Sequence, residues 1–123
     1  MELGALAPGR RARRGRVTDP GPVFAALADP NRRLLLDLLA LRGTATATEL
    51  AHELPVSRQA VAKHLSTLDG AGLVARSRSG RETRYRLRPD ALTEAAEWMA
   101  AAGARWETRL ADLERFLGAR RVP

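Results

Sequence analysis

Apolar residues recur at helical spacing through the first third of the chain. Residues 22–28 predict a short helix, and Asp29 followed by Pro30 predicts the start of a second one, since aspartate caps a helix and proline suits its first turn. This second helix ends at Gly43. The leucines that should form its buried stripe are Leu34, Leu35, Leu38 and Leu39.

Two more helices are predicted on either side of a turn at residues 55–56. Thr46 and Glu49 have the spacing of a capping box, in which each side chain binds the other residue's backbone N–H. Ser57 is the predicted cap of the fourth helix. Its inward-facing residues should be Val61, Leu65 and Leu68. Two such helices joined by a short turn form a helix-turn-helix, whose second helix is shaped to enter a DNA major groove.

A β-hairpin pattern follows the fourth helix. Strands are predicted at residues 73–77 and 83–87 around a loop at 79–82, with Tyr85 and Leu87 on the buried face. Six arginines lie in this segment: Arg76, Arg78, Arg81, Arg84, Arg86 and Arg88. Guanidinium groups bind phosphates well, so the hairpin should be a positively charged wing. Its single acid, Glu82, is expected to orient a neighbouring arginine.

The last predicted helix, residues 90–117, carries a heptad seam sustained for nearly four repeats and roughly 39 Å. The seam positions, alternately four and three residues apart, are Leu92, Ala96, Met99, Gly103, Trp106, Leu110, Leu113 and Leu117. One small domain cannot cover so long a stripe, so two copies of the helix should pair, with Phe24 assisting. Gly103 would let the two backbones come close. The alternative is that the helix packs back on its own domain.

Charge is distributed unevenly along the 123 residues, which have room for one compact domain (22–117). Residues 57–88 carry eight Lys and Arg against two acids, whereas residues 90–116 carry three against six. This separation predicts one surface for nucleic acid and another with a different role. Residues 1–21 contain five arginines and predict a disordered basic arm, and residues 118–123 predict a flexible tail.

The outward face of the fourth helix has residue types that read bases. Gln59 and Lys63 share this face with Ser66 and Thr67; glutamine pairs with adenine and lysine with guanine. Alternatively, these are ordinary solvated polar positions. The residues expected to contact DNA are Thr46, Thr48, Ser57, Arg58, Gln59, Lys63, Ser66, Thr67, Arg78, Arg81 and Arg84.

Several classes of function are disfavoured by what the sequence lacks. The chain has no cysteine, which excludes disulfides, thiolate metal sites and cysteine nucleophiles. His52 and His64 lie twelve residues apart on different predicted helices and make a poor transition-metal site. No catalytic triad or glycine-rich phosphate loop is present. We therefore expect no enzyme, metal or cofactor. Without a secretion signal or an apolar run of membrane-spanning length, the expected location is the cytoplasm.

Three segments together resemble winged helix-turn-helix regulators of the ArsR/SmtB type: FAALADPNRRLLLDLLA (24–40), TATELAHELPVSRQAVAKHLSTLDGAGLV (46–74) and GRETRYRL (80–87). The resemblance implies a mostly α-helical fold with a small β-hairpin wing and a long C-terminal dimerisation helix. It also implies a homodimer that binds an imperfect palindrome in double-stranded DNA, usually to repress transcription. Metal-sensing members place a cysteine pair in the helix of Thr48 and His52, or histidines and acids along the last helix. This chain has neither pattern, so it resembles the branch without metal sites, and its inducer is unknown.

Three functions fit these observations. The first is a dimeric, sequence-specific repressor, and the varied polar face of the fourth helix favours it. The second is a nonspecific DNA-coating or architectural protein, which the net charge of +7 favours. The third is a protein-interaction module whose heptad helix pairs with a foreign partner.

Overall fold

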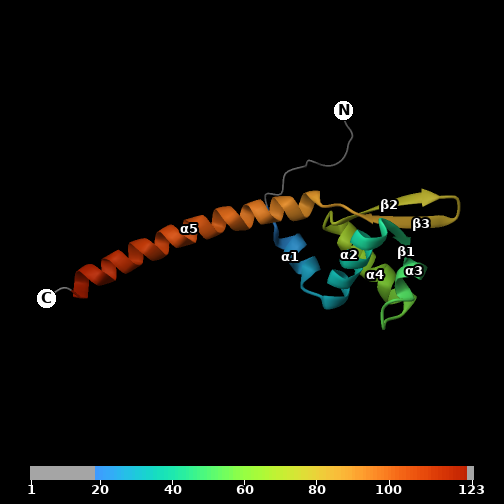
Figure 1. Ribbon diagram of the computed structural model, residues 1–123, viewed down its shortest axis with the longest axis horizontal. Helices are drawn as coiled ribbons and strands as arrows, with labels where there is room; N and C mark the ends of the chain where they lie inside the picture. Colours follow the sequence, from blue (N-terminus) through green and yellow to red (C-terminus); the bar gives the residue numbers. More distant parts are fainter. Residues whose placement is uncertain (1–18, 122–123) are drawn as a thin grey trace, which may run out of the picture.

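The computed structural model describes residues 19–121, which form a helical body with a hairpin projecting from one side and a long helix from the other (Figure 1). The elements are α1 (Gly21–Leu27), α2 (Pro30–Arg42), β1 (Thr44–Thr46), α3 (Ala47–Ala51), α4 (Arg58–Gly70), β2 (Val74–Ser79), β3 (Glu82–Leu87) and α5 (Asp90–Arg121). This architecture confirms the predicted fold class. Most of the predicted N-terminal arm, residues 1–18, lies outside the described residues.

Three helices begin where the capping signals placed them. Asp29 accepts hydrogen bonds from the backbone N–H groups of Asn31 and Arg32 at the start of α2. Thr46 and Glu49 form the complete capping box of α3, and the Ser57 hydroxyl accepts from the N–H of Ala60 in α4. Because capping side chains satisfy N–H groups that have no partner within the helix, these starts are readable from sequence. The last helix departs from expectation: it continues to Arg121, four residues beyond the predicted end.

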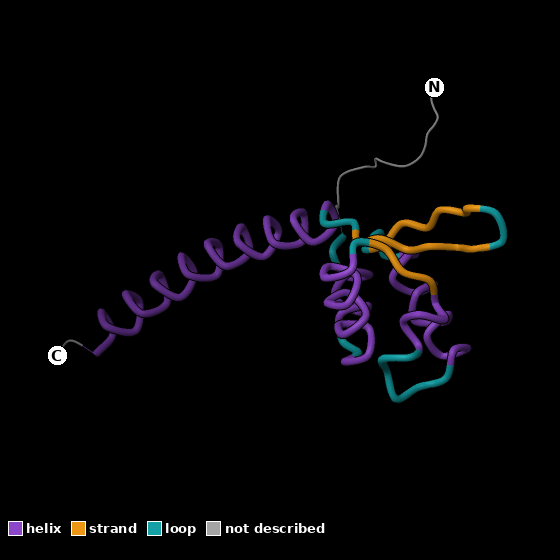
Figure 2. Tube along the Cα trace, turned by 45° about the vertical axis from the view of Figure 1, so that its right-hand side comes forward, coloured by secondary structure: helices purple, strands orange, loops and turns teal. Residues whose placement is uncertain are grey.

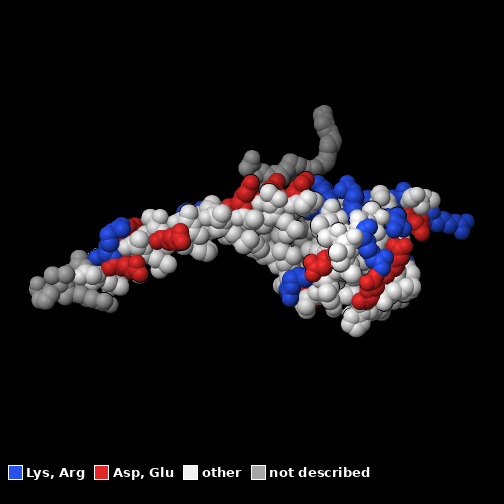
Figure 3. Space-filling model, viewed as in Figure 1, with Lys and Arg blue, Asp and Glu red and all other residues white. Residues whose placement is uncertain are grey.

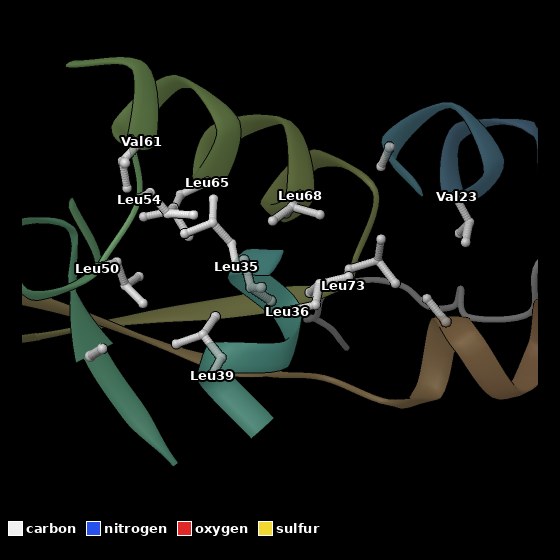
Figure 4. Close-up of a cluster of buried hydrophobic side chains, with 14 of the residues drawn as sticks. Val23, Leu35, Leu36, Leu39, Leu50, Leu54, Val61, Leu65, Leu68 and Leu73 are labelled. Atoms are coloured by element: carbon white, nitrogen blue, oxygen red, sulfur yellow. The ribbon is translucent and has the colours of Figure 1, made fainter. Parts of the chain in front are cut away.

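The core lies between α2, α3, α4 and the base of the hairpin (Figure 4). Its largest fully buried side chains are Leu35, Leu39, Leu50, Val61, Leu65, Leu68, Leu73 and Val74. The predicted stripe on α2 was partly wrong, because Leu36 is buried while Leu34 is 46% exposed. Six of the thirteen residues of α2 are leucines. A helix so rich in leucine has no clear polar face, and its neighbours decide which side is buried.

The sheet has three strands in the order β1-β3-β2, not the two that were predicted. β1 was missed because it is only three residues long, although its middle residue, Ala45, is fully buried. The hairpin is also longer than expected, with Ser79 paired to Glu82 across a two-residue turn. Gly80 in that turn has φ of 62°, a conformation that two-residue hairpin turns require. The wing is therefore longer than predicted, and it stands away from the helical body (Figure 2).

The helix α5 has two parts with different surroundings. Its first turns pack on the core through Ala91, Ala95 and Leu92, and the ring of Trp98 meets Phe24 of α1 edge-on at 5.9 Å. Farther along, α5 leaves the domain, and its 32 residues reach about 48 Å. Across the described residues, we find no helix with the length and apolar character that crossing a membrane requires.

Candidate DNA-binding surface

The helix α4 buries Val61, Leu65 and Leu68 as predicted and turns its opposite face to solvent. Gln59, Lys63, Ser66 and Thr67 are all exposed on this helix. The Thr67 hydroxyl donates to the Lys63 carbonyl at 3.3 Å. Within residues 19–121, the side chains of Gln59, Lys63 and Ser66 have no hydrogen-bond partner, so their polar groups are available to a ligand.

Several predicted DNA-contacting residues near the start of α4 also have structural roles. Arg58 Nε donates to Thr48 Oγ1 at 2.8 Å, which joins the first residue of α4 to α3. The side-chain oxygens of Thr46 and Ser57 serve as helix caps. All of these groups lie where α3 and α4 meet. The Arg58–Thr48 hydrogen bond connects the two helices, and all four side chains remain at least partly exposed.

The wing arginines fall into two groups. Arg78, Arg81 and Arg86 are exposed, and the described part of the chain offers them no ion pair. By contrast, Arg76 lies 3.6 Å from a carboxylate oxygen of Asp69 in α4, and Arg88 lies 3.7 Å from one of Asp90. Basic atoms gather over the hairpin, including its far end, whereas α5 and the helical body carry both acidic and basic atoms (Figure 3). The far end of the hairpin is thus the clearly basic part of this face.

Arg84 differs from the other wing arginines because its side chain turns toward the domain. It pairs with Glu82 at 3.3 Å, which agrees with the expectation that Glu82 orients a neighbouring arginine. It also pairs with Glu49 of α3 at 3.2 Å. The N–H of Thr46, followed by the charges of Arg84 and Arg42, holds the pKa of Glu49 below its ordinary value, so this carboxylate stays ionised at neutral pH.

Apart from Phe24 in α1, the residues predicted for dimerisation occupy both parts of α5. Leu92 and Phe24 are half-buried against their own core, and Trp98, which the heptad pattern did not include, packs on Phe24. The distal seam is open to solvent. Its exposed large side chains are Met99, Trp106, Leu110, Leu113 and Leu117, which are 43% to 59% exposed. A Cβ added at Gly103 would meet no atom within 4 Å.

Among the described residues, no three His, Cys, Asp or Glu side chains form a cluster that could hold a metal ion. The two histidines have different surroundings. His52 is exposed at the end of α3, whereas His64 Nδ1 lies 3.3 Å from Arg32 Nη1. Arg32 also donates to the carbonyls of Ala25 and Ala26 near the end of α1. Arg32 thus joins α1 to α2 and lies against α4.

Sequence comparison relates the chain to known regulators. A family model described as a helix-turn-helix domain matches residues 27–76. An uncharacterized HTH-type transcriptional regulator of Bacillus subtilis, YuzN, is 46% identical over 71 residues, which cover 53% of this chain and 74% of the relative. The transcriptional repressor SdpR of the same organism is 35% identical over 77 residues, covering 63% of this chain and 84% of the repressor.

Solved structures agree with these relatives. An ArsR-like transcriptional regulator from Rhodococcus sp. RHA1 superposes with a TM-score of 0.71 and 43% identity, covering 79% of this chain and 91% of that one. The solution structure of a homodimeric winged helix-turn-helix DNA-binding domain from Mycobacterium bovis, a possible ArsR-family regulator, gives a TM-score of 0.55 and 28% identity. That match covers 68% of this chain and 77% of the other.

Proposed function

The chain belongs to the ArsR family of winged helix-turn-helix transcriptional regulators, which bind DNA and are not enzymes, and we propose that it is a homodimeric repressor of a palindromic operator. One observation carries the proposal. The exposed polar face of α4 lies next to a wing whose residues Arg78 and Arg81 are exposed and have no ion pair within the described chain, and basic atoms reach the far end of the hairpin (Figure 3). The related protein SdpR is named a transcriptional repressor, which supports repression rather than activation of transcription by this protein.

In this proposal α4 enters the major groove. Gln59 and Lys63 lie in its first two turns, where a recognition helix meets base edges, and Ser66 and Thr67 continue the same face. The groups at the junction of α3 and α4 bind the flanking phosphates; they are Thr46, Thr48, Ser57 and Arg58. Arg78 and Arg81 on the wing bind the backbone of the DNA. Interactions with bases then supply specificity and the arginines supply affinity.

The distal half of α5 supports a homodimer. Its exposed apolar seam is covered by nothing in the described chain, and the neighbour from Mycobacterium bovis is homodimeric. A two-fold axis would present two α4 helices to successive major grooves on one side of the duplex. The half-sites should then lie about 34 Å apart, or a multiple of that. Because a transcriptional regulator acts on chromosomal DNA, we propose a cytoplasmic location for this protein.

We further infer that metal ions do not regulate DNA binding. The chain has no thiolate, and of its two histidines His52 follows the last residue of α3 while His64 lies in α4. His64, moreover, has Arg32 beside its Nδ1, and a fixed positive charge disfavours a cation there. A small-molecule inducer is left open by this proposal.

Selection of bound duplexes from a random DNA pool tests the function. We expect an enriched inverted repeat, and transcription from a promoter carrying that repeat should fall when the protein is added. If the bound pool shows no enriched sequence, the protein is a nonspecific coating protein. If no duplex is retained at moderate salt, the alternative of a protein-interaction module is favoured. A rise in transcription would make the protein an activator.

A further inference from the structure

Arg84 lies at the point where the sheet narrows from three strands to two. The last pair between β1 and β3 joins Thr46 to Arg84, whereas β2 continues beside β3 as far as Ser79. Beyond Arg84 the wing is therefore a two-stranded ribbon that stands away from the domain (Figure 2). Such ribbons twist more strongly than wider sheets and have little stability of their own. Interactions made at this point therefore set where the tip of the wing lies.

All three nitrogens of the Arg84 guanidinium group have partners. Nε donates to Thr44 Oγ1 at 3.1 Å, and Nη1 donates to Glu82 Oε1 at 3.3 Å. Nη2 donates to Glu49 Oε1 at 3.2 Å. The Arg84 side chain is 30% exposed, which makes it better covered than Arg76, the other wing arginine that is paired to the helical body. All three nitrogens of the Arg84 guanidinium group are thus already hydrogen-bonded in the protein without DNA.

Glu49 connects this arginine to the helix-turn-helix. The same Oε1 atom accepts the backbone N–H of Thr46 at 2.9 Å as part of the capping box of α3. The next residue toward the N-terminus, Thr48, accepts the hydrogen bond from Arg58 of α4. A continuous set of interactions therefore runs from the base of the free ribbon, through the start of α3, to the start of the recognition helix.

We propose that Arg84 is a positioning residue that acts through Glu49 to fix the angle between the wing and the helix-turn-helix, and that it does not bind a phosphate. This inference rests on the proposed function. Arg81, at the tip, lies three residues beyond Arg84, or about 10 Å along the strand. A rotation of about 10° at Arg84 would move the tip by roughly 2 Å, enough to break a hydrogen bond to a phosphate.

Two conservative substitutions break the Arg84–Glu49 pair from opposite sides. Arg84→Lys keeps the positive charge but loses the planar fork that binds three partners. Glu49→Gln keeps a side-chain oxygen for the N–H of Thr46 but loses the charge that faces Arg84. Arg86→Lys is the matched control, because Arg86 lies two residues along the same face of β3, is exposed and has no partner among residues 19–121. Arg81→Gln serves as the reference for removal of a phosphate-binding group.

The first measurement compares affinities for a selected duplex and a scrambled one, at several salt concentrations and at a temperature where every variant is folded. Arg84→Lys and Glu49→Gln should each lower the affinity for both duplexes by at least about twofold, because a displaced wing loses phosphate contacts that every duplex offers. The double variant should lose no more than either single one. The salt slope should fall in these variants and in Arg81→Gln, and it should be unchanged in Arg86→Lys. If Arg84→Lys keeps the wild-type affinity, or if Glu49→Gln binds DNA as tightly as the wild type or more tightly because it releases Arg84 to a phosphate, the proposal is overturned.

The second measurement needs no DNA, so it separates this inference from the proposed function. Amide hydrogen exchange of the paired residues in β1 and β3 should become at least about twofold faster in Arg84→Lys and in Glu49→Gln, and not in Arg86→Lys. Unchanged exchange would mean that Arg84 does not hold the wing. If the wild-type protein fails to distinguish the two duplexes, the proposed function is wrong, and exchange alone decides the role of Arg84.

Discussion

The dimer seam on α5 can be tested with one double substitution, Leu110→Asp with Leu113→Asp. Both leucines lie on the distal part of α5, outside the core of their own domain, and both belong to the exposed seam. The substitution should therefore leave the helix-turn-helix folded while it removes self-association. Loss of dimerisation should in turn abolish tight binding to a two-fold operator, because each half-site would then bind alone.

The size of the effect follows from the exposed fractions. Full burial of a leucine side chain is worth about 1.5–3 kcal/mol. Leu110 is 59% exposed and Leu113 is 51% exposed in the single chain, so about half of that value, or roughly 1 kcal/mol, is still to be gained at each. Two protomers contribute two leucines each, or roughly 4 kcal/mol, which is about a thousandfold in the dimer dissociation constant. Aspartate adds the cost of burying a charge, so this value is a lower bound.

Sedimentation equilibrium over a range of protein concentrations is the assay. Leu41→Asp is the control, because Leu41 is 85% exposed on α2, outside the seam, and its replacement should leave the dimer intact. Circular dichroism should show that the domain is folded and unfolds cooperatively in all variants. A double variant that still sediments as a dimer at wild-type concentrations would refute the assignment of the interface to the distal half of α5.

Four more outcomes are expected. Gln59→Ala should cost on the order of 1–3 kcal/mol on the preferred duplex and little on random DNA; equal losses on both would contradict base reading. Arg81→Ala should weaken binding to both duplexes alike. The slope of log affinity against log salt concentration should fall by about one unit for each phosphate that the protein no longer binds. A slope equal to that of wild type would exclude phosphate binding by Arg81. Titration with zinc or copper should leave operator affinity unchanged, whereas a tight, substoichiometric effect would point to a site shared across the dimer. Although burial raises the pKa of Asp29, the N–H groups of Asn31 and Arg32 bring this pKa below its ordinary value. The Asp29 carboxylate therefore stabilises the folded protein above the pKa that Asp29 has in the unfolded chain, and this stabilisation is lost as the pH falls through the pKa of the folded state. Asp29→Ala should accordingly lower the urea midpoint at pH 7, with a difference that shrinks in acid and not in base.

Signals that act within a few residues were readable from the sequence. The caps at Asp29, Thr46 and Ser57 each bind backbone groups two or three residues away, so their spacing alone located three helix starts. The inward face of α4 was equally clear, because Val61, Leu65 and Leu68 recur at intervals of four and three residues with polar residues between them. The face of α2 was not, because leucines lie all around it, and only the packing of α4 and the sheet selects Leu36 over Leu34.

Interactions between distant segments could not be predicted in this way. Alternation placed Arg84 on the polar face of the wing, which suggested a residue that faces DNA. Two of its partners, Thr44 and Glu49, are 40 and 35 residues away, and they reach it only because β1 pairs with β3. The missed strand and the unforeseen partners of Arg84 therefore have one cause. Had the Thr44-Ala45-Thr46 alternation been interpreted as a strand, the capping glutamate would have been placed next to β3, and a carboxylate beside an arginine would have indicated an ion pair.

One short segment thereby serves both folding and recognition. Residues 44–49 supply an edge strand, a helix cap and the anion that holds Arg84, so the start of α3 and the base of the wing are built from the same segment. Neither feature depends on a residue that would read bases. Gln59, Lys63 and Ser66 are correspondingly free of side-chain hydrogen bonds within the described chain, and they can change without disturbing the scaffold. A surface arranged in this way permits a new operator sequence to be recognised through substitutions on α4 alone, while Arg84 and Glu49 keep the wing where the phosphates of any duplex lie.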